Sequence, residues 1–140
     1  MTRLIIYIGF GLLLSACNQA GTPEQIITEN LEHLEQGIEE KDPDMVLDLI
    51  HPNFGTRSGH DKLWLKRTMA FYMLKHTQIE IISSGLEIDL EPDVAKAHFN
   101  AVVTGGQGLI PDQGALYQVQ TEWRLEDGDW LLVYAAWTRP

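Results

Sequence analysis

The hydrophobic pattern of this chain changes its period once, near Thr77. Before that point apolar residues recur at helical spacings, since Ile27, Leu31, Leu34 and Ile38 are separated by four, three and four positions. After it, apolar and polar residues alternate, which is the pattern of strands with one buried face. Helices followed by strands predict an α+β domain with a mainly antiparallel sheet.

Start signals divide the first half of the chain into three helices. Thr22 precedes Pro-Glu-Gln, a capping-box pattern that begins a helix at residue 23. A second signal, Asp-Pro-Asp, opens a short helix over about 43–50, and the run HPNFG directly after it ends that helix. Ser58 caps a third helix, which continues to about Lys75.

Alternating segments in the second half predict four strands, at 78–90, 94–104, 116–125 and 130–138. The first of them is expected to bend at a bulge near Gly85. Asp127 and Gly128 form a tight hairpin before the last strand. That strand is apolar on both faces, which indicates that both are covered. A central position in the sheet or a homodimer interface would cover them.

The first sixteen residues have the pattern of a secretory signal peptide. Arg3 supplies a positive charge, and residues 4–14 form an uncharged run that is too short for a bilayer-spanning helix of about 20 apolar residues. Leu-Ser-Ala-Cys follows, and its Cys17 is the only cysteine of the chain. This motif resembles the lipobox of bacterial lipoproteins. The resemblance implies cleavage before Cys17 and attachment of lipid to its sulfur and its new amine.

The same resemblance implies a location in the bacterial cell envelope. Asn18 stands where Asp would imply retention in the inner membrane, so the expected address is the outer membrane, facing the periplasm. The chain therefore divides into a signal peptide (1–16), a lipidated cysteine with a short tether (17–22) and a globular domain (23–140). A membrane reached through the lipid anchor is one expected partner.

The net charge of the chain limits which other classes of partner are expected. The net charge of −10 argues against nucleic acid and against an anionic membrane surface as electrostatic partners. The only basic segment is 57–75, whose charges either offset the acidic first helix or bind an anionic ligand. The spacings of the five histidines match no metal motif, and we expect neither a metal nor a cofactor.

The order of elements over 23–138 resembles that of the NTF2-like family, also called SnoaL-like. Local cues are EEKDPDMVLDLIHPNF after the first helix, SGHDKL at the third and DGDW at the last hairpin. The resemblance implies a cone, in which three N-terminal helices pack against a strongly curved, mainly antiparallel sheet. In that family the sheet curls around the third helix and encloses an apolar pocket, often in a dimer. Members include isomerases, dehydratases and non-catalytic binding proteins, so the fold leaves the function open.

We expect the pocket to lie between the third helix and the sheet, because alanines on the wall at 95, 97 and 101 leave space there. Tyrosine hydroxyls and Thr121 would be its few polar groups, which favours a neutral or amphipathic ligand. The expected lining residues are Leu65, Met69, Tyr72, Phe99, Tyr117, Val119, Thr121 and Trp123.

Candidate catalytic residues are few. Tyr72, His60 and Asp61 could serve an enzyme, although Asp61 also fits a capping box with Ser58. The histidines at 51, 76 and 98 are interpreted as surface or capping residues. We therefore favour a non-catalytic, lipid-anchored module that binds a small apolar or amphipathic ligand or a segment of a partner. The alternatives are a small isomerase, dehydratase or hydrolase, and a domain that only dimerises through its outer sheet face.

Overall fold

The computed structural model describes residues 21–76, 78–105 and 114–140. The signal peptide, Cys17 and most of the tether lie outside the described residues. None of the helices in the described ranges is long and apolar enough to cross a bilayer. The elements are α1 (Pro23–Glu39), α2 (Pro43–Leu47), β1 (Ile50–Thr56), α3 (Lys62–Lys75), β2 (Ile79–Leu90), β3 (Val94–Gly105), β4 (Ala115–Glu126) and β5 (Asp129–Thr138).

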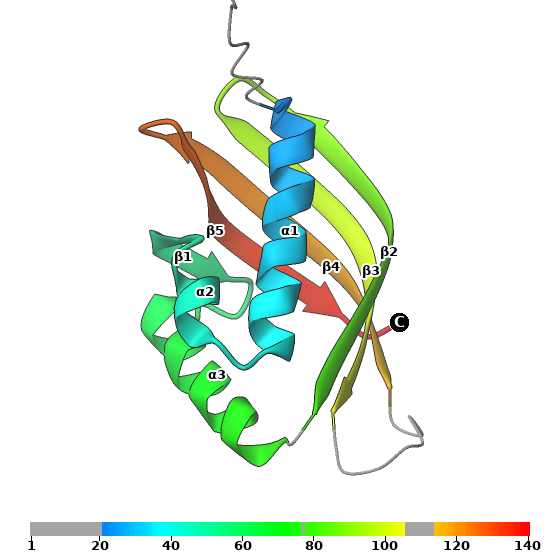
Figure 1. Ribbon diagram of the computed structural model, residues 1–140. Coiled ribbons are helices and arrows are strands. Elements are labelled where there is room, and N and C mark those ends of the chain that lie inside the picture. The colour runs from blue at the N-terminus through cyan, green and yellow to red at the C-terminus, as the bar shows by residue number, and fades with distance from the viewer. Residues whose placement is uncertain (1–20, 77, 106–113) are drawn as a thin grey trace, which may run out of the picture.

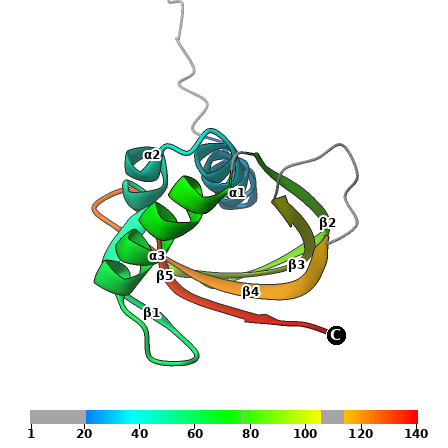
Figure 2. The ribbon, with the colours of Figure 1, turned by 90° about the horizontal axis from the view of Figure 1, so that it is seen from below.

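The strands form one curved sheet in the order β1-β5-β4-β3-β2. Neighbours from β2 to β5 are antiparallel, whereas β1 runs parallel to β5. All three helices lie on the concave side of this sheet (Figures 1 and 2). The α+β architecture expected from the sequence is confirmed, with one strand more than the four expected.

The additional strand is β1, at a place where the sequence predicted the last residue of the second helix and the HPNFG run that ends it. The helix α2 already ends at Leu47, and the strand begins at Ile50. Pro52 has no N–H to donate to a ladder, and it is accommodated because β1 is an edge strand with β5 on one side only. Ile50 and Phe54 are buried, so this short segment joins the core through its side chains.

The helix α1 lies along the concave face and begins with the expected capping box. The Gln25 backbone N–H donates to Thr22 Oγ1 at 3.3 Å, and the Thr22 N–H donates to Gln25 Oε1 at 3.0 Å. The expected apolar stripe faces the sheet, where it joins one hydrophobic cluster. That cluster includes Ile27, Leu31 and Leu34 of α1 with Ala95, Ala97 and Trp123 of the sheet.

From the sequence we expected the small residues of β3 to leave an empty space. In the structure Ala95 and Ala97 are instead in close contact with other side chains. Ala95, Ala97, Trp123 and Ile27 each have 0 % of their surface exposed. A side chain that ends at Cβ allows the opposite element to approach closely, and here α1 takes up the space. Burial of apolar surface at this contact contributes about 25 cal/mol per Å², so a filled cone is the stable arrangement.

The helix α3 therefore does not occupy the middle of the cone. It packs against β1 and α2, at the end of the sheet where β1 and β5 lie (Figures 1 and 2). Its N-cap is Asp61, whose Oδ1 accepts from the Trp64 N–H at 2.9 Å, and not Ser58 as expected. Met69 is buried in the core, whereas Tyr72 is exposed.

Register shifts in β2 and between β4 and β5 determine which side chains share a face of the sheet. The expected bulge in β2 is confirmed by a register shift after Ser84 and by Gly85, whose φ of +67° suits glycine. A second shift, between β4 and β5, lies at the Glu122–Trp123 step. Simple alternation had placed Trp130 and Ala135 on opposite faces. The shift puts them on the same concave face, because their partners Leu125 and Thr121 share it.

Candidate functional site

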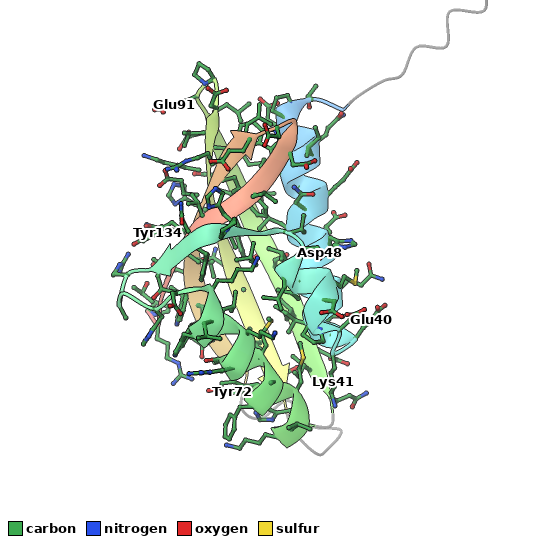
Figure 3. The ribbon with its side chains drawn as sticks, turned by 90° about the vertical axis from the view of Figure 1, so that its left-hand side faces the viewer. Glu40, Lys41, Asp48, Tyr72, Glu91 and Tyr134 are labelled. Carbon is green, nitrogen blue, oxygen red and sulfur yellow. The ribbon has the colours of Figure 1, made fainter. Side chains whose placement is uncertain are left out.

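The eight expected pocket residues range from fully buried to exposed. Met69, Thr121 and Trp123 are core residues with little or no exposure. The remaining five are the half-buried Leu65, Phe99, Tyr117 and Val119 and the exposed Tyr72, which Figure 3 labels on α3.

The polar groups that we expected to contact a ligand make hydrogen bonds to other groups of the protein. Trp123 Nε1–H donates to Thr121 Oγ1 at 3.0 Å, and the Thr121 hydroxyl donates to the Ala97 carbonyl at 3.3 Å. Tyr117 accepts a hydrogen bond from Arg139 Nη2 at 3.3 Å, and the same guanidinium lies 5.4 Å from its ring centre. Thr121 is thus a structural hydroxyl, because leaving Trp123 Nε1 without an acceptor would cost about 1–3 kcal/mol.

A pocket lies between α1 and the bulged part of β2, beside β3. Its volume is about 70 Å³, far below the roughly 300–1,000 Å³ of sites for drug-sized molecules. Such a space admits one side chain or the end of an acyl chain. Its lining consists of the apolar Leu31, Leu86 and Phe99 and the polar Thr28, Glu32, Glu35 and Ser83.

Glu35 is the pocket residue with altered acidity. Burial raises the pKa of its carboxyl group above the ordinary value, a hydrogen bond with Ser83 opposes this, and the charges of Glu39 and Glu32 add to it. On the sequence alone, the glutamates of this helix are most simply interpreted as a solvated face. A signal was present, however, because Glu35 follows Leu31 by four positions and so borders the apolar stripe.

The candidate catalytic residues do not form a site together. His60 is exposed and its ring stacks on Trp64, with 4.1 Å between the ring centres. Asp61 caps α3 through its carboxylate. Tyr72 stacks on His76 at 5.7 Å. Among the described residues none of these three side chains hydrogen-bonds to another, and each has a structural contact.

His51 is buried, which contradicts its interpretation as a surface or capping residue. Its Nδ1 accepts from the Asn53 backbone N–H at 2.9 Å, so the hydrogen of the neutral ring is on Nε2. Nε2 then donates to Glu126 Oε2 at 2.8 Å and ties β1 to the end of β4. Both ring nitrogens have protein partners, which makes this pair a structural link between distant strands. Within the described ranges, no three His, Cys, Asp or Glu side chains are grouped so as to hold a metal ion.

No protein-family model and no curated sequence matches this chain. Several solved structures, however, are similar to this chain. An NTF2-like protein of Pseudomonas putida KT2440 is 16 % identical, with coverage of 84 % of this chain and 86 % of its own and a TM-score of 0.74. A scytalone dehydratase candidate from Novosphingobium aromaticivorans is 13 % identical, with coverage of 84 % and 83 % and a TM-score of 0.74.

An NTF2-like superfamily protein from Salmonella enterica serovar Typhimurium is similar as well. It is 20 % identical, with coverage of 84 % of this chain and 90 % of its own and a TM-score of 0.67. At such identities the likeness shows the fold alone. The fold is the NTF2-like cone, as the order of elements in the sequence led us to expect.

The raised pKa of Glu35 predicts a pH-dependent effect of Glu35→Gln on stability. A carboxyl group whose pKa is higher in the folded state favours folding below its unfolded-state pKa, and this contribution is lost as pH rises through the folded-state pKa. We therefore expect Glu35→Gln to be more stable than the unmodified protein at pH 7. The difference should shrink as pH falls toward about 4.

Urea unfolding of both proteins at several pH values measures this difference. Glu29→Gln is the matched control, because Glu29 is an exposed residue of the same helix and its replacement should leave the difference small. A Glu35→Gln protein that gains nothing over the control at pH 7 would show that the Glu35 carboxylate is not disfavoured by folding.

Proposed function

We propose, on the basis of the NTF2-like cone that this chain shares with the solved structures, that it is a lipid-anchored, non-catalytic binding module of the bacterial cell envelope. The pocket between α1 and the bulged part of β2 would hold one apolar or amphipathic group, either the end of a small ligand or a side chain of a partner protein. The anchor would be Cys17 at the outer membrane, with the domain facing the periplasm.

The observation that supports binding rather than catalysis is the chemistry of the concave face. The inward positions of β3 carry no titratable group, since they are Ala95, Ala97, Phe99, Ala101 and Val103. On β4 the buried Thr121 and Trp123 bond to each other and to the backbone. A general acid or base must reach a substrate through hydrogen-bond contact. Tyr117 is the titratable residue on this wall, and its hydroxyl already accepts from Arg139.

The support for the anchor comes from the sequence. Residues 4–14 form an uncharged run, and the Leu-Ser-Ala-Cys motif follows it directly. The described domain begins only a few residues later, with α1 at Pro23. The extended tether from 17 to 22 would reach at most about 18 Å, so the domain would work close to the bilayer.

Replacement of the lipobox cysteine tests the anchor. We expect Cys17→Ser to abolish incorporation of a labelled fatty acid and to remove the lipid mass from the mature N-terminal peptide. Asn18→Ser is the matched control, because it changes the neighbouring residue and keeps the thiol. Fatty-acid labelling that survives in Cys17→Ser would refute attachment at this residue.

A second function, that of a small dehydratase- or isomerase-type enzyme, is favoured by Glu35. A carboxyl group with a raised pKa beside Ser83 and Phe99 in a pocket is suited to proton transfer. The similar structure from Novosphingobium, a scytalone dehydratase candidate, adds an analogy of fold only.

Native mass spectrometry of the full chain purified from membranes distinguishes the two functions. Under the binding proposal, the unmodified protein and Glu35→Gln should carry the same co-purified mass, because Glu35 makes no chemical change to it. An enzyme would give a different result. Glu35→Gln would carry the mass of unreacted substrate, and the protein with Glu35 in place would not carry that mass. Phe99→Ser should lose the bound mass, and Leu116→Ser on the convex face should keep it.

We also propose a homodimer through the convex face of the sheet. Ile82, Val102 and Leu116 form one cross-strand row on that face, because Ile82 pairs with Val102 and Val102 pairs with Leu116. Ile82 is 67 % exposed and Leu116 is exposed as well, which leaves an apolar row in contact with water. On β5 the corrected convex positions include Leu131, Tyr134 and Ala136.

Sedimentation of the detergent-solubilised chain at tens of micromolar tests this dimer. We expect the unmodified protein to sediment as a dimer and Ile82→Glu as a monomer, since the new carboxylate would have to be buried without a partner. Leu63→Glu, which places the same charge on exposed α3, should remain dimeric. A monomeric unmodified protein would exclude the interface.

A further inference from the structure

The outward side of α3 combines apolar and basic side chains. Phe71 is 60 % exposed and Leu74 is 89 % exposed, and Leu63 and Ala70 are exposed with them. Lys66 and Arg67 are exposed on the same side. We call these six residues the basic apolar face.

Helical geometry explains why the six residues form one surface. Leu63, Arg67, Ala70 and Leu74 are spaced by four, three and four positions, so they lie in one line along the helix. Lys66 and Phe71 flank that line. The opposite side of α3 carries Leu65, Met69 and Met73, which pack into or against the core. The helix is thus apolar on two sides, and the described part of the protein covers one of them.

The net charge of the whole chain argued against an anionic membrane surface as a partner, but the charge of this helix is different and revises that expectation. No Asp or Glu occurs between Lys62 and Lys75, although the net charge of the protein is −10. Among the described residues, no carboxylate lies within 4.0 Å of the charged groups of Lys66, Arg67 or Lys75. Lys75 instead lies over the Phe71 ring at 5.7 Å, next to the basic apolar face.

We propose that the basic apolar face binds the headgroup region of an anionic bilayer. Leucine and phenylalanine enter the boundary between headgroups and acyl chains, while lysine and arginine beside them contact lipid phosphates, and this combination is typical of helices that lie on membranes. The proposal rests on the proposed function for the presence of a bilayer near the domain. It adds a second contact, which would hold the anchored domain against the surface in one orientation.

Other surfaces of this protein fit the face less well. The exposed side of α1 is acidic and carries Glu24, Glu29 and Glu32, but it has no exposed leucine or phenylalanine to cover Leu74. Pairing of two α3 helices from two copies would bring their lysines and arginines together, which costs free energy. An anionic bilayer supplies both partners that this face needs, because its negatively charged headgroups lie directly next to its apolar acyl layer.

The acidity of the rest of the protein does not oppose this contact at short range. Figure 3 labels Glu40, at the end of α1, and Asp48, at the end of α2; neither belongs to α3. Exposed charges are screened over about 8 Å in physiological salt, so groups on other elements act weakly on the headgroups that touch α3.

The test uses the full chain with its anchor, reconstituted in vesicles that contain phosphatidylglycerol. A polarity-sensitive fluorophore is attached to Leu74→Cys, and in a second protein to His33→Cys on the exposed side of α1. We expect the label at 74 to enter an apolar environment, protected from an aqueous quencher, and the label at 33 to stay in water. High salt or vesicles of phosphatidylcholine alone should release the label at 74.

Variants without the basic charges of α3 measure how much those charges contribute to docking. Lys66→Gln with Arg67→Gln should lower the ratio of docked to undocked protein about 30-fold, the factor expected for two basic side chains at an anionic surface. Lys96→Gln with Arg124→Gln removes the same charge from exposed positions of β3 and β4 and should leave the ratio unchanged. Circular dichroism confirms that each variant is folded.

The outcomes separate this inference from the proposed function. A lipidated protein whose label at 74 stays in water overturns the inference and leaves the anchor intact. A protein without lipid overturns the anchor, and the label at 74 then reports the α3 contact alone. A label that is protected without vesicles, in proportion to protein concentration, shows a second copy on the face and overturns the inference. Equal docking to neutral vesicles refutes recognition of anionic headgroups.

Discussion

The contact between α1 and the alanines of β3 is the packing on which the rest of the structure depends. Ala95 and Ala97 present only methyl groups, so Ile27 and its neighbours on α1 reach the sheet and meet Trp123. Side chains that are fully buried fill the described part of the cone at that level. A small pocket lies at the margin, beside Glu35, where the β2 bulge interrupts the pairing of the edge strand.

That packing also determines which polar groups are available for chemistry. Thr121 and Trp123 satisfy each other in the core, and His51 is paired with Glu126 between β1 and β4. A buried polar group without a partner costs free energy, so these side chains form hydrogen bonds within the protein and are not available to a ligand. Glu35 differs because it lies at the edge of the apolar stripe, where it is partly desolvated and still reaches the pocket.

Because α1 fills the cone, α3 lies beside β1 (Figure 2). One apolar side of α3 is left uncovered by the described part of the protein. The molecule therefore has surfaces of opposite character, an acidic α1 and a basic apolar α3. This separation of charge gives a domain near a bilayer a means to orient, even though its net charge is negative. The convex row of Ile82, Val102 and Leu116 is independent of both surfaces and is available to another copy.

The sequence by itself determined the features that neighbouring residues control. The capping box at Thr22, the four later strands and the hairpin at Asp127 and Gly128, with φ values of +50° and +83°, follow from local backbone preferences. Only the tertiary structure decided that residues 50–56 form a strand, because this short segment containing proline is held by β5, far along the chain. The element that fills the cone and the sheet face on which Trp130 lies were decided in the same way. Each depends on which distant surface comes into contact, and spacing within one element does not contain that information.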